Sequence, residues 1–190
     1  MDMRPFAFAA AALLAGCIPS SPWVQAERDF QSSDDQYRIQ LPDGWMRVNV
    51  DETLLVTRDG LNLQRIQVAR HELGKPLKNS KRAPRPGMEP AEIADLLSGE
   101  VSSGEGITGV KVVESSPASL SGARGFKLVI AFKDGDGLKR RAVVYGLMGQ
   151  KALWIAAYQA PQRHYFELDL AAFEKAVRTF RLAAAELPKA

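Results

Sequence analysis

Residues 125–160 read GFKLVIAFKDGDGLKRRAVVYGLMGQKALWIAAYQA, and their pattern sets the fold class. Alternate positions from Phe126 to Phe132 are large and apolar, which is the period of a strand with one buried face. Turn-forming residues at positions 134–137 (DGDG) and 149–150 (GQ) separate this run from two further apolar runs. Because short turns join consecutive strands, we predict an antiparallel meander of three strands.

The chain before the meander predicts more strands. YRIQLPDGW at residues 37–45 alternates like a strand and ends in a turn. TLLVTRDGLNLQRIQVAR at residues 53–70 predicts a hairpin that turns at Asp59-Gly60. The second arm alternates through Leu61 and Leu63 and then changes phase at Ile66, which is compatible with a β-bulge.

Two helices are predicted, one before the meander and one after it. The first begins at Pro90, and apolar residues then recur at helical spacing as far as Val101. The second covers residues 166–180, with a break expected near Asp169, a favourable N-cap residue. Antiparallel strands combined with two helices indicate an α+β domain, an antiparallel β-sheet flanked by helices.

The order of these elements resembles the PsbP-like and Mog-type family. The matching features are YRIQLPDGW, the meander, and FEKAVRTFRL at residues 173–182, so the similarity spans residues 36–182. The resemblance implies an α/β/α sandwich with the sheet between helical layers. It also implies a role in binding other proteins, since members of that family act mainly in this way.

The only cysteine of the chain, Cys17, follows a short apolar segment. Residues 6–14 are too few to cross a bilayer, but with Ala15 and Gly16 they form the pattern of a secretory signal. The tetrapeptide LAGC at residues 14–17 resembles the bacterial lipobox, which implies removal of residues 1–16 and acylation (including palmitate) of Cys17. Met3 is an alternative start that would give this signal its expected positive charge. The absence of aspartate after Cys17 favours the periplasmic face of the outer membrane, by resemblance to enteric bacteria.

The remaining chain is expected to form one domain. Residues 17–34 are predicted to be a lipidated tether, residues 35–183 a single PsbP/Mog-like domain, and residues 184–190 a C-terminal tail. A net charge of +3 with 25% charged residues is too weak a basic bias to predict a nucleic-acid partner. The expected partners are the membrane, reached through the lipid on Cys17, and an envelope protein or anionic lipid.

A basic, proline-rich run precedes the first helix. We name it the basic loop, and its candidate residues for binding an anionic surface are Lys75, Lys78, Lys81, Arg82 and Arg85. The functional interpretation is a site for anionic headgroups, phosphosugars or an acidic partner. The alternative is an ordinary solvated loop.

No motif predicts catalysis, a metal site or a cofactor. GEGITG at residues 104–109 matches a dinucleotide-binding pattern, but it follows a helix and precedes a strand, the reverse of the required order. His71 and His164 are the only histidines, and neither has the spacing of a zinc site or a nucleophile elbow nearby. DGDG at residues 134–137 lacks the later ligands of a calcium loop.

The leading functional hypothesis is therefore a non-catalytic, membrane-anchored lipoprotein that acts as a binding or assembly-accessory domain in the cell envelope. The alternative is a carrier or sensor of a small apolar or lipid ligand, for which the candidate pocket residues are Trp45, Trp154 and Tyr158. A hydrolase ranks third, and it would need a histidine beside a carboxylate in a concave site.

Overall fold

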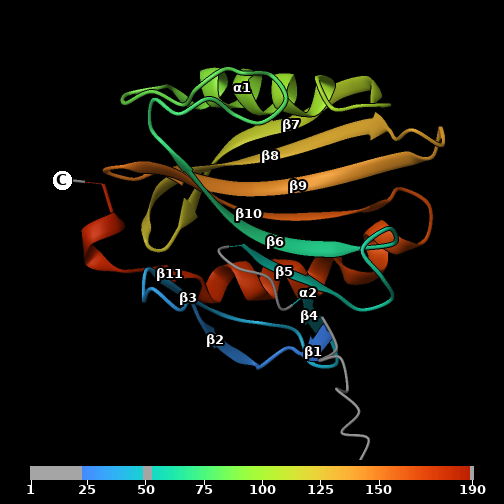
Figure 1. Ribbon diagram of the computed structural model, residues 1–190, viewed down its shortest axis with the longest axis horizontal. Coiled ribbons are helices and arrows are strands. Elements are labelled where there is room, and N and C mark those ends of the chain that lie inside the picture. Colours follow the sequence, from blue (N-terminus) through green and yellow to red (C-terminus); the bar gives the residue numbers. More distant parts are fainter. Residues whose placement is uncertain (1–22, 49–52, 189–190) are drawn as a thin grey trace, which may run out of the picture.

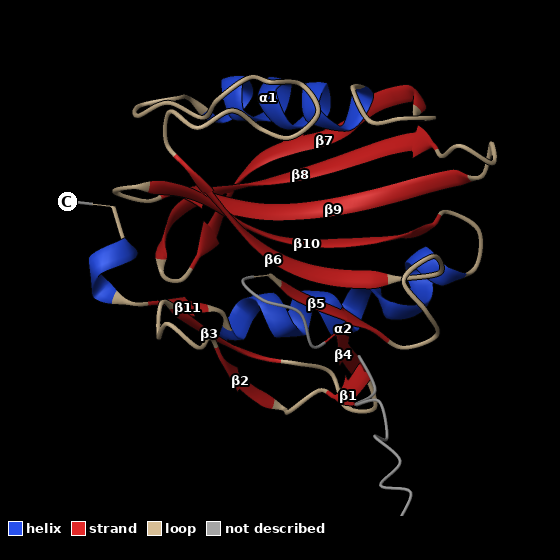
Figure 2. Ribbon diagram, in the orientation of Figure 1, coloured by secondary structure: helices blue, strands red, loops and turns tan. Residues whose placement is uncertain are grey.

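An eight-stranded antiparallel sheet forms the centre of the protein (Figures 1 and 2). The computed structural model describes residues 23–48 and 53–188. The order of strands in this sheet is β1-β4-β5-β6-β10-β9-β8-β7. Their bounds are β1 Trp23–Gln25, β4 Met46–Val48, β5 Leu54–Thr57, β6 Arg65–Glu72, β10 Ala152–Pro161, β9 Lys139–Met148, β8 Ala123–Lys133 and β7 Thr108–Leu120.

Two helices and a second, small sheet cover the faces of the large sheet. Helix α1 (Pro90–Ser102) packs on β7 and β8, and α2 (Tyr165–Thr179) packs on the opposite face against β10, β9 and β3. The small sheet has the order β11-β3-β2, with β2 at Asp29–Gln31, β3 at Tyr37–Gln40 and β11 at Arg181–Leu182. A 3₁₀ helix, η1 (Ala184–Glu186), follows β11. This arrangement confirms the predicted α+β fold and its α/β/α layering.

The meander forms as the sequence predicts. β8 pairs with β9 and β9 pairs with β10, all antiparallel. Alternate residues of β8, including Phe126 and Ile130, join the core under α1, whereas Trp154 and Tyr158 of β10 join the core over α2. The turn at 134–137 is closed by the Asp134 carboxylate, which accepts hydrogen bonds from the Asp136 and Leu138 N–H groups.

The hairpin of β5 and β6 also forms, but its second arm begins later than its alternation suggests. Leu61 and Leu63 lie in the connecting loop, and β6 begins at Arg65. Thr57 closes this loop, because its hydroxyl donates to the Gln64 carbonyl and accepts from the Gly60 N–H. The phase change in the sequence therefore marks the end of a loop and not a bulge.

Helix α2 is continuous through Asp169, so the predicted break is wrong. The Asp169 side chain is buried and accepts hydrogen bonds from Arg58 Nη1 at 2.8 Å and Gln64 Nε2 at 3.2 Å. Its carboxylate therefore joins α2 to the β5–β6 loop instead of capping a helix. Helix α1 begins at Pro90 as predicted, with the Glu92 side chain accepting a hydrogen bond from the Glu89 N–H.

The boundaries predicted for the tether and the tail need correction. Residues 23–25 pair with β4 and residues 29–31 pair with β3, so this part of the predicted tether belongs to the fold. The expected tail contains η1, in which Glu186 is buried and accepts a hydrogen bond from Trp154 Nε1 at 3.1 Å. The predicted signal peptide and Cys17 lie outside the described residues. Among the residues that are described, no helix combines the length and apolarity needed to cross a membrane.

Candidate binding cleft

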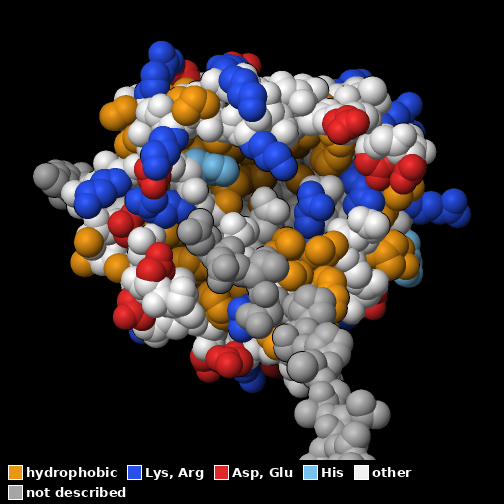
Figure 3. Space-filling view, in the orientation of Figure 1, with side chains coloured by type: hydrophobic (Ala, Val, Ile, Leu, Met, Phe, Trp, Pro, Cys, Tyr) orange, Lys and Arg blue, Asp and Glu red, His pale blue; other side chains and the backbone are white. Residues whose placement is uncertain are grey.

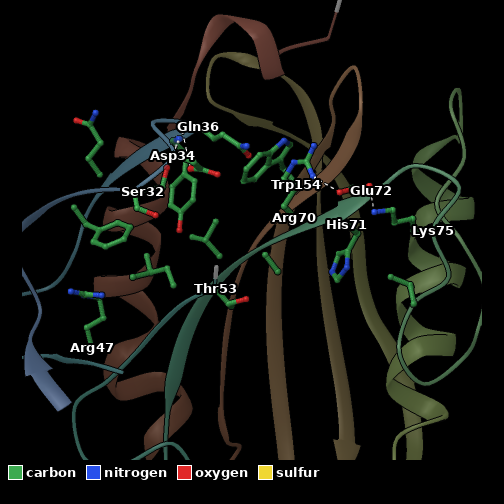
Figure 4. A pocket seen from close by; sticks show the side chains of 18 of the residues that line it. Ser32, Asp34, Gln36, Arg47, Thr53, Arg70, His71, Glu72, Lys75 and Trp154 are labelled. Atoms are coloured by element: carbon green, nitrogen blue, oxygen red, sulfur yellow. Dashed lines mark hydrogen bonds and ion pairs between the residues drawn. The ribbon is translucent and has the colours of Figure 1, made fainter. Parts of the chain in front are cut away.

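A cleft of about 1050 Å³ lies between the small sheet and the end of β6 (Figure 4). One wall comes from β2 and β3, with Phe30 and Tyr37, and the other from β6 and the start of the basic loop. Trp154 of β10 lines the cleft between them. Figure 3 shows a histidine and basic side chains gathered on the face seen in Figure 1.

Aromatic side chains give the cleft its apolar surface. The Tyr37 ring lies 5.6 Å from the Trp154 ring and 6.0 Å from the Phe30 ring, measured between centroids. Trp154 is 2% exposed, so only its edge reaches the cleft. Burial raises the pKa of Tyr37, and the nearby Asp34 charge adds to this effect, so the hydroxyl stays protonated at neutral pH.

The charges of the cleft largely balance one another. Glu72 accepts from Arg70 at 3.2 Å and pairs with Lys75 at 2.5 Å, and these contacts hold the pKa of its carboxyl below the ordinary value. Arg70 also lies over the Trp154 ring, 5.9 Å from its centroid. At the other end of the cleft, Arg47 lies over the Phe30 ring at 5.5 Å. A ligand with a strong net charge therefore gains little from this lining.

Two buried polar atoms of the cleft residues have no hydrogen-bond partner within the described part of the chain. They are Gln36 Oε1, an acceptor, and Arg70 Nε, a donor. Glu186 Oε2 is 3.8 Å from Arg70 Nε, which is too far for a hydrogen bond. Buried polar atoms are normally paired, so each of these positions is suited to a group from a ligand.

His71 is the histidine of the cleft. Burial lowers its pKa, and the opposing effect of Glu100 is smaller, so the imidazole is neutral at pH 7. The Glu100 carboxylate accepts hydrogen bonds from Asn79 and Ser80. The described residues also contain no group of His, Cys, Asp and Glu side chains that could hold a metal ion.

The three predicted pocket residues do not share a cavity. Trp45, Trp154 and Tyr158 are each at most 2% exposed and belong to the packed core over α2. Trp154 reaches the main cleft, and Trp45 borders a separate hollow of about 320 Å³ beside Arg58 and Asp169. The Tyr158 hydroxyl is used inside the fold, because it donates to the Tyr165 carbonyl at 2.7 Å.

The basic loop is folded against α1, not extended. Its Leu77 is buried, and the Asn79 and Ser80 N–H groups donate to the Glu100 carboxylate at 2.9 and 2.8 Å. Of the five candidate cations, Arg82 pairs with Asp95 of α1 at 2.8 Å and Lys75 pairs with Glu72 as described above. The remaining candidates, Lys78, Lys81 and Arg85, make no ion pair with any residue described. Of the five, Lys75 lines the cleft, where its charge is paired with that of Glu72.

The residues that form the wall on the β2 and β3 side carry no sequence motif that would have marked them as a site. Phe30 falls in the predicted tether of residues 17–34, and Gln36 and Arg47 fall in the predicted domain without a role assigned to them. Two large aromatic residues, Trp23 and Phe30, in a segment of mainly small and polar residues were the signal that it packs on the domain. His164 lies at the start of α2 with its ring edge-on to Tyr165, outside the cleft.

The architecture is that of the PsbP/Mog1 α+β fold. A solution structure of cyanobacterial PsbP (CyanoP) from Synechocystis is similar, with a TM-score of 0.56 and 12% identity over 88% of this chain and 96% of that one. The crystal structure of the Ran-binding protein Mog1p from Saccharomyces cerevisiae is similar too, with a TM-score of 0.56 and 9% identity over 84% of this chain and 96% of that one. No protein-family profile and no curated protein sequence matches the chain. At these identities the likeness establishes the fold alone.

Proposed function

We propose that this protein is a non-catalytic binding domain of the bacterial cell envelope, that a lipid on Cys17 anchors it to a membrane, and that its cleft binds a partner protein. The observation that carries the proposal is the cleft itself, which joins aromatic surface, balanced charges and unpaired polar atoms without an acid–base pair. Mog1p, which shares the fold, is a Ran-binding protein, so this fold supports binding of a protein in at least that case. The periplasmic face of the outer membrane remains the proposed location.

A lipid or small apolar ligand is the weaker candidate. Such ligands are held in concave sites whose walls are mostly apolar. Trp45 and Tyr158, which would have formed that kind of wall, are packed in the core instead. The walls of the cleft carry the charged side chains of Arg47, Arg70 and Glu72. A purely apolar ligand would exclude water from these charges without forming hydrogen bonds to them, which costs binding free energy.

Site-specific photocrosslinking in cells tests the proposal. A benzophenone amino acid replaces Ser33, an exposed residue of the cleft, and a matched variant carries it at Glu105, an exposed residue outside the cleft. We expect a discrete adduct that contains a second protein from the Ser33 variant and none from the Glu105 variant. Equal adducts from both positions, or adducts with lipid only, would contradict a protein-binding cleft.

A further inference from the structure

Two arginines lie on one face of the large sheet, near one of its ends. Arg65 of β6 is directly opposite Gln159 of β10, which in turn is opposite Ala142 of β9. Residues directly opposite one another point to the same face of a sheet, and so do residues two apart on one strand, so Arg140 of β9 shares this face with Arg65. Ala142 belongs to the core under α1, which identifies the face as the one that α1 covers in part.

The fold holds Arg140 in place at this end of the sheet. The β5–β6 loop and the β8–β9 turn lie at the same end (Figure 1). Arg140 is buried, and its Nε donates to the Asp134 carboxylate in the turn while its Nη2 donates to the Asn62 carbonyl in the β5–β6 loop. Its Nη1 makes no hydrogen bond with any residue that the structure describes, so one nitrogen keeps its capacity to donate.

Arg65 has no acidic partner among the described residues. Its Nη2 donates to the side-chain oxygen of Gln159 at 2.8 Å, and this acceptor is neutral. Within the described chain, Asp134 is the only carboxylate that pairs with either arginine. Burial lowers the pKa of Arg65, and the nearby charge of Arg140 adds to this effect. Two guanidinium charges therefore share one carboxylate, and one positive charge is left uncompensated.

An oxyanion has the chemistry that completes this arrangement. Charges shielded from water are normally paired with an opposite charge. A guanidinium presents its N–H groups in a rigid fork that matches the oxygens of a carboxylate or a phosphate. The Nε and Nη1 groups of Arg65 make no hydrogen bond with a described residue, and the amide nitrogen of Gln159 is a further donor.

We propose that Arg65, Arg140 and Gln159 form a binding site for an oxyanion, which is a carboxylate or a phosphate group. The anion compensates the charge of Arg65 and receives N–H groups from all three side chains. The site goes beyond the proposed function and is independent of it, because none of the three residues lines the cleft.

An NMR titration of the full-length protein in a non-ionic detergent tests the proposal. Sodium phosphate and sodium acetate are added in separate experiments at pH 7.5, with sodium chloride keeping the ionic strength constant, and the side-chain Nε–H signal of Arg65 is followed. We expect a saturable shift with a dissociation constant in the millimolar range. A shift with one of the two anions assigns the site to that group, and shifts with both assign it to oxyanions in general.

Arg65→Gln removes the uncompensated charge. It should weaken anion binding, measured by isothermal titration calorimetry, by about tenfold or more. Without either anion its melting temperature should stay the same or rise, because the repulsion from Arg140 is lost. The anion that binds should raise the melting temperature of the wild type and not that of this variant. Arg65→Lys, which keeps the charge but lacks the fork, should bind more weakly than the wild type.

Arg124→Gln on β8 is the matched control, because Arg124 is exposed and its replacement changes the net charge by the same amount. It should leave the affinity for the anion unchanged. An equal loss of affinity in Arg124→Gln and Arg65→Gln, or no saturable shift of the Arg65 signal with either anion, would overturn the proposal. Either result would leave the proposed protein-binding cleft unaffected.

Discussion

His71 makes the stability of the folded protein depend on pH, and the burial of its side chain sets the direction of that dependence. Burial lowers its pKa below the ordinary 6.5, so the folded protein binds this proton less readily than the unfolded chain. The stability that neutral His71 contributes is therefore complete above about pH 6.5 and is lost as the pH falls toward the lowered pKa. The carboxyls with lowered pKa values, such as Glu72 and Glu100, lose their contribution only at lower pH, below their ordinary value of 4.5.

We predict that the melting temperature falls between pH 7.5 and pH 5.5 in the wild type and that His71→Asn removes most of this fall. Thermal unfolding followed by circular dichroism at both pH values measures it. His164→Asn, at the start of α2, is the control and should keep the wild-type dependence. An unchanged slope in His71→Asn would show that other groups control stability in this range.

The elements that the sequence predicted correctly are those whose signals are local. The meander can be predicted from the alternation within each strand and from the turn residues at 134–137 and 149–150. Strands β1 and β2 are three residues each and owe their existence to pairing with β4 and β3, so no local pattern could reveal them. The cleft joins Phe30, Arg70 and Trp154, which are far apart in the chain, and for that reason only the folded structure shows it.

The basic loop is an element whose charge and packing can be separated by experiment. Three of its five cations have no ion pair with a described residue, and each basic side chain near an anionic bilayer contributes about 1 kcal/mol. Replacing all five with serine should therefore weaken binding of the unacylated domain to phosphatidylglycerol vesicles by tenfold or more. The melting temperature should change little, because the ion pairs of Lys75 and Arg82 are largely exposed.

Vesicle co-sedimentation at low and high salt measures this effect. The matched control replaces five exposed cations on other elements with serine and so changes the net charge equally, at Lys111, Lys133, Lys139, Lys175 and Arg178. Equal binding by the loop variant and the wild type would show that the loop is simply solvated. A large fall in melting temperature would show instead that its cations stabilise the contact with α1.

In the proposed function, a lipid on Cys17 holds the whole protein at the membrane. We predict that Cys17→Ser leaves the protein uncleaved or released from the membrane fraction, because acyl chains contribute about 0.8 kcal/mol per buried CH₂. Cell fractionation and the mass of the N-terminal peptide measure this outcome, with Ser20→Ala as a control that should fractionate like the wild type. Normal fractionation of Cys17→Ser, with an unmodified terminus, would contradict the lipobox interpretation.

The early start of β1 limits the distance that the domain could reach from a membrane to which Cys17 is anchored. Cys17 and Trp23 are six residues apart, and six residues of fully extended chain span at most about 20 Å. A lipid on Cys17 would therefore confine the domain to a thin layer at the membrane surface, a volume much smaller than the compartment around it. In that layer the effective concentration of any partner in the same membrane is raised, so weak affinity in the cleft suffices for high occupancy. Lengthening the chain between Cys17 and Trp23 would dilute the domain into a larger volume and lower that occupancy without altering a single contact.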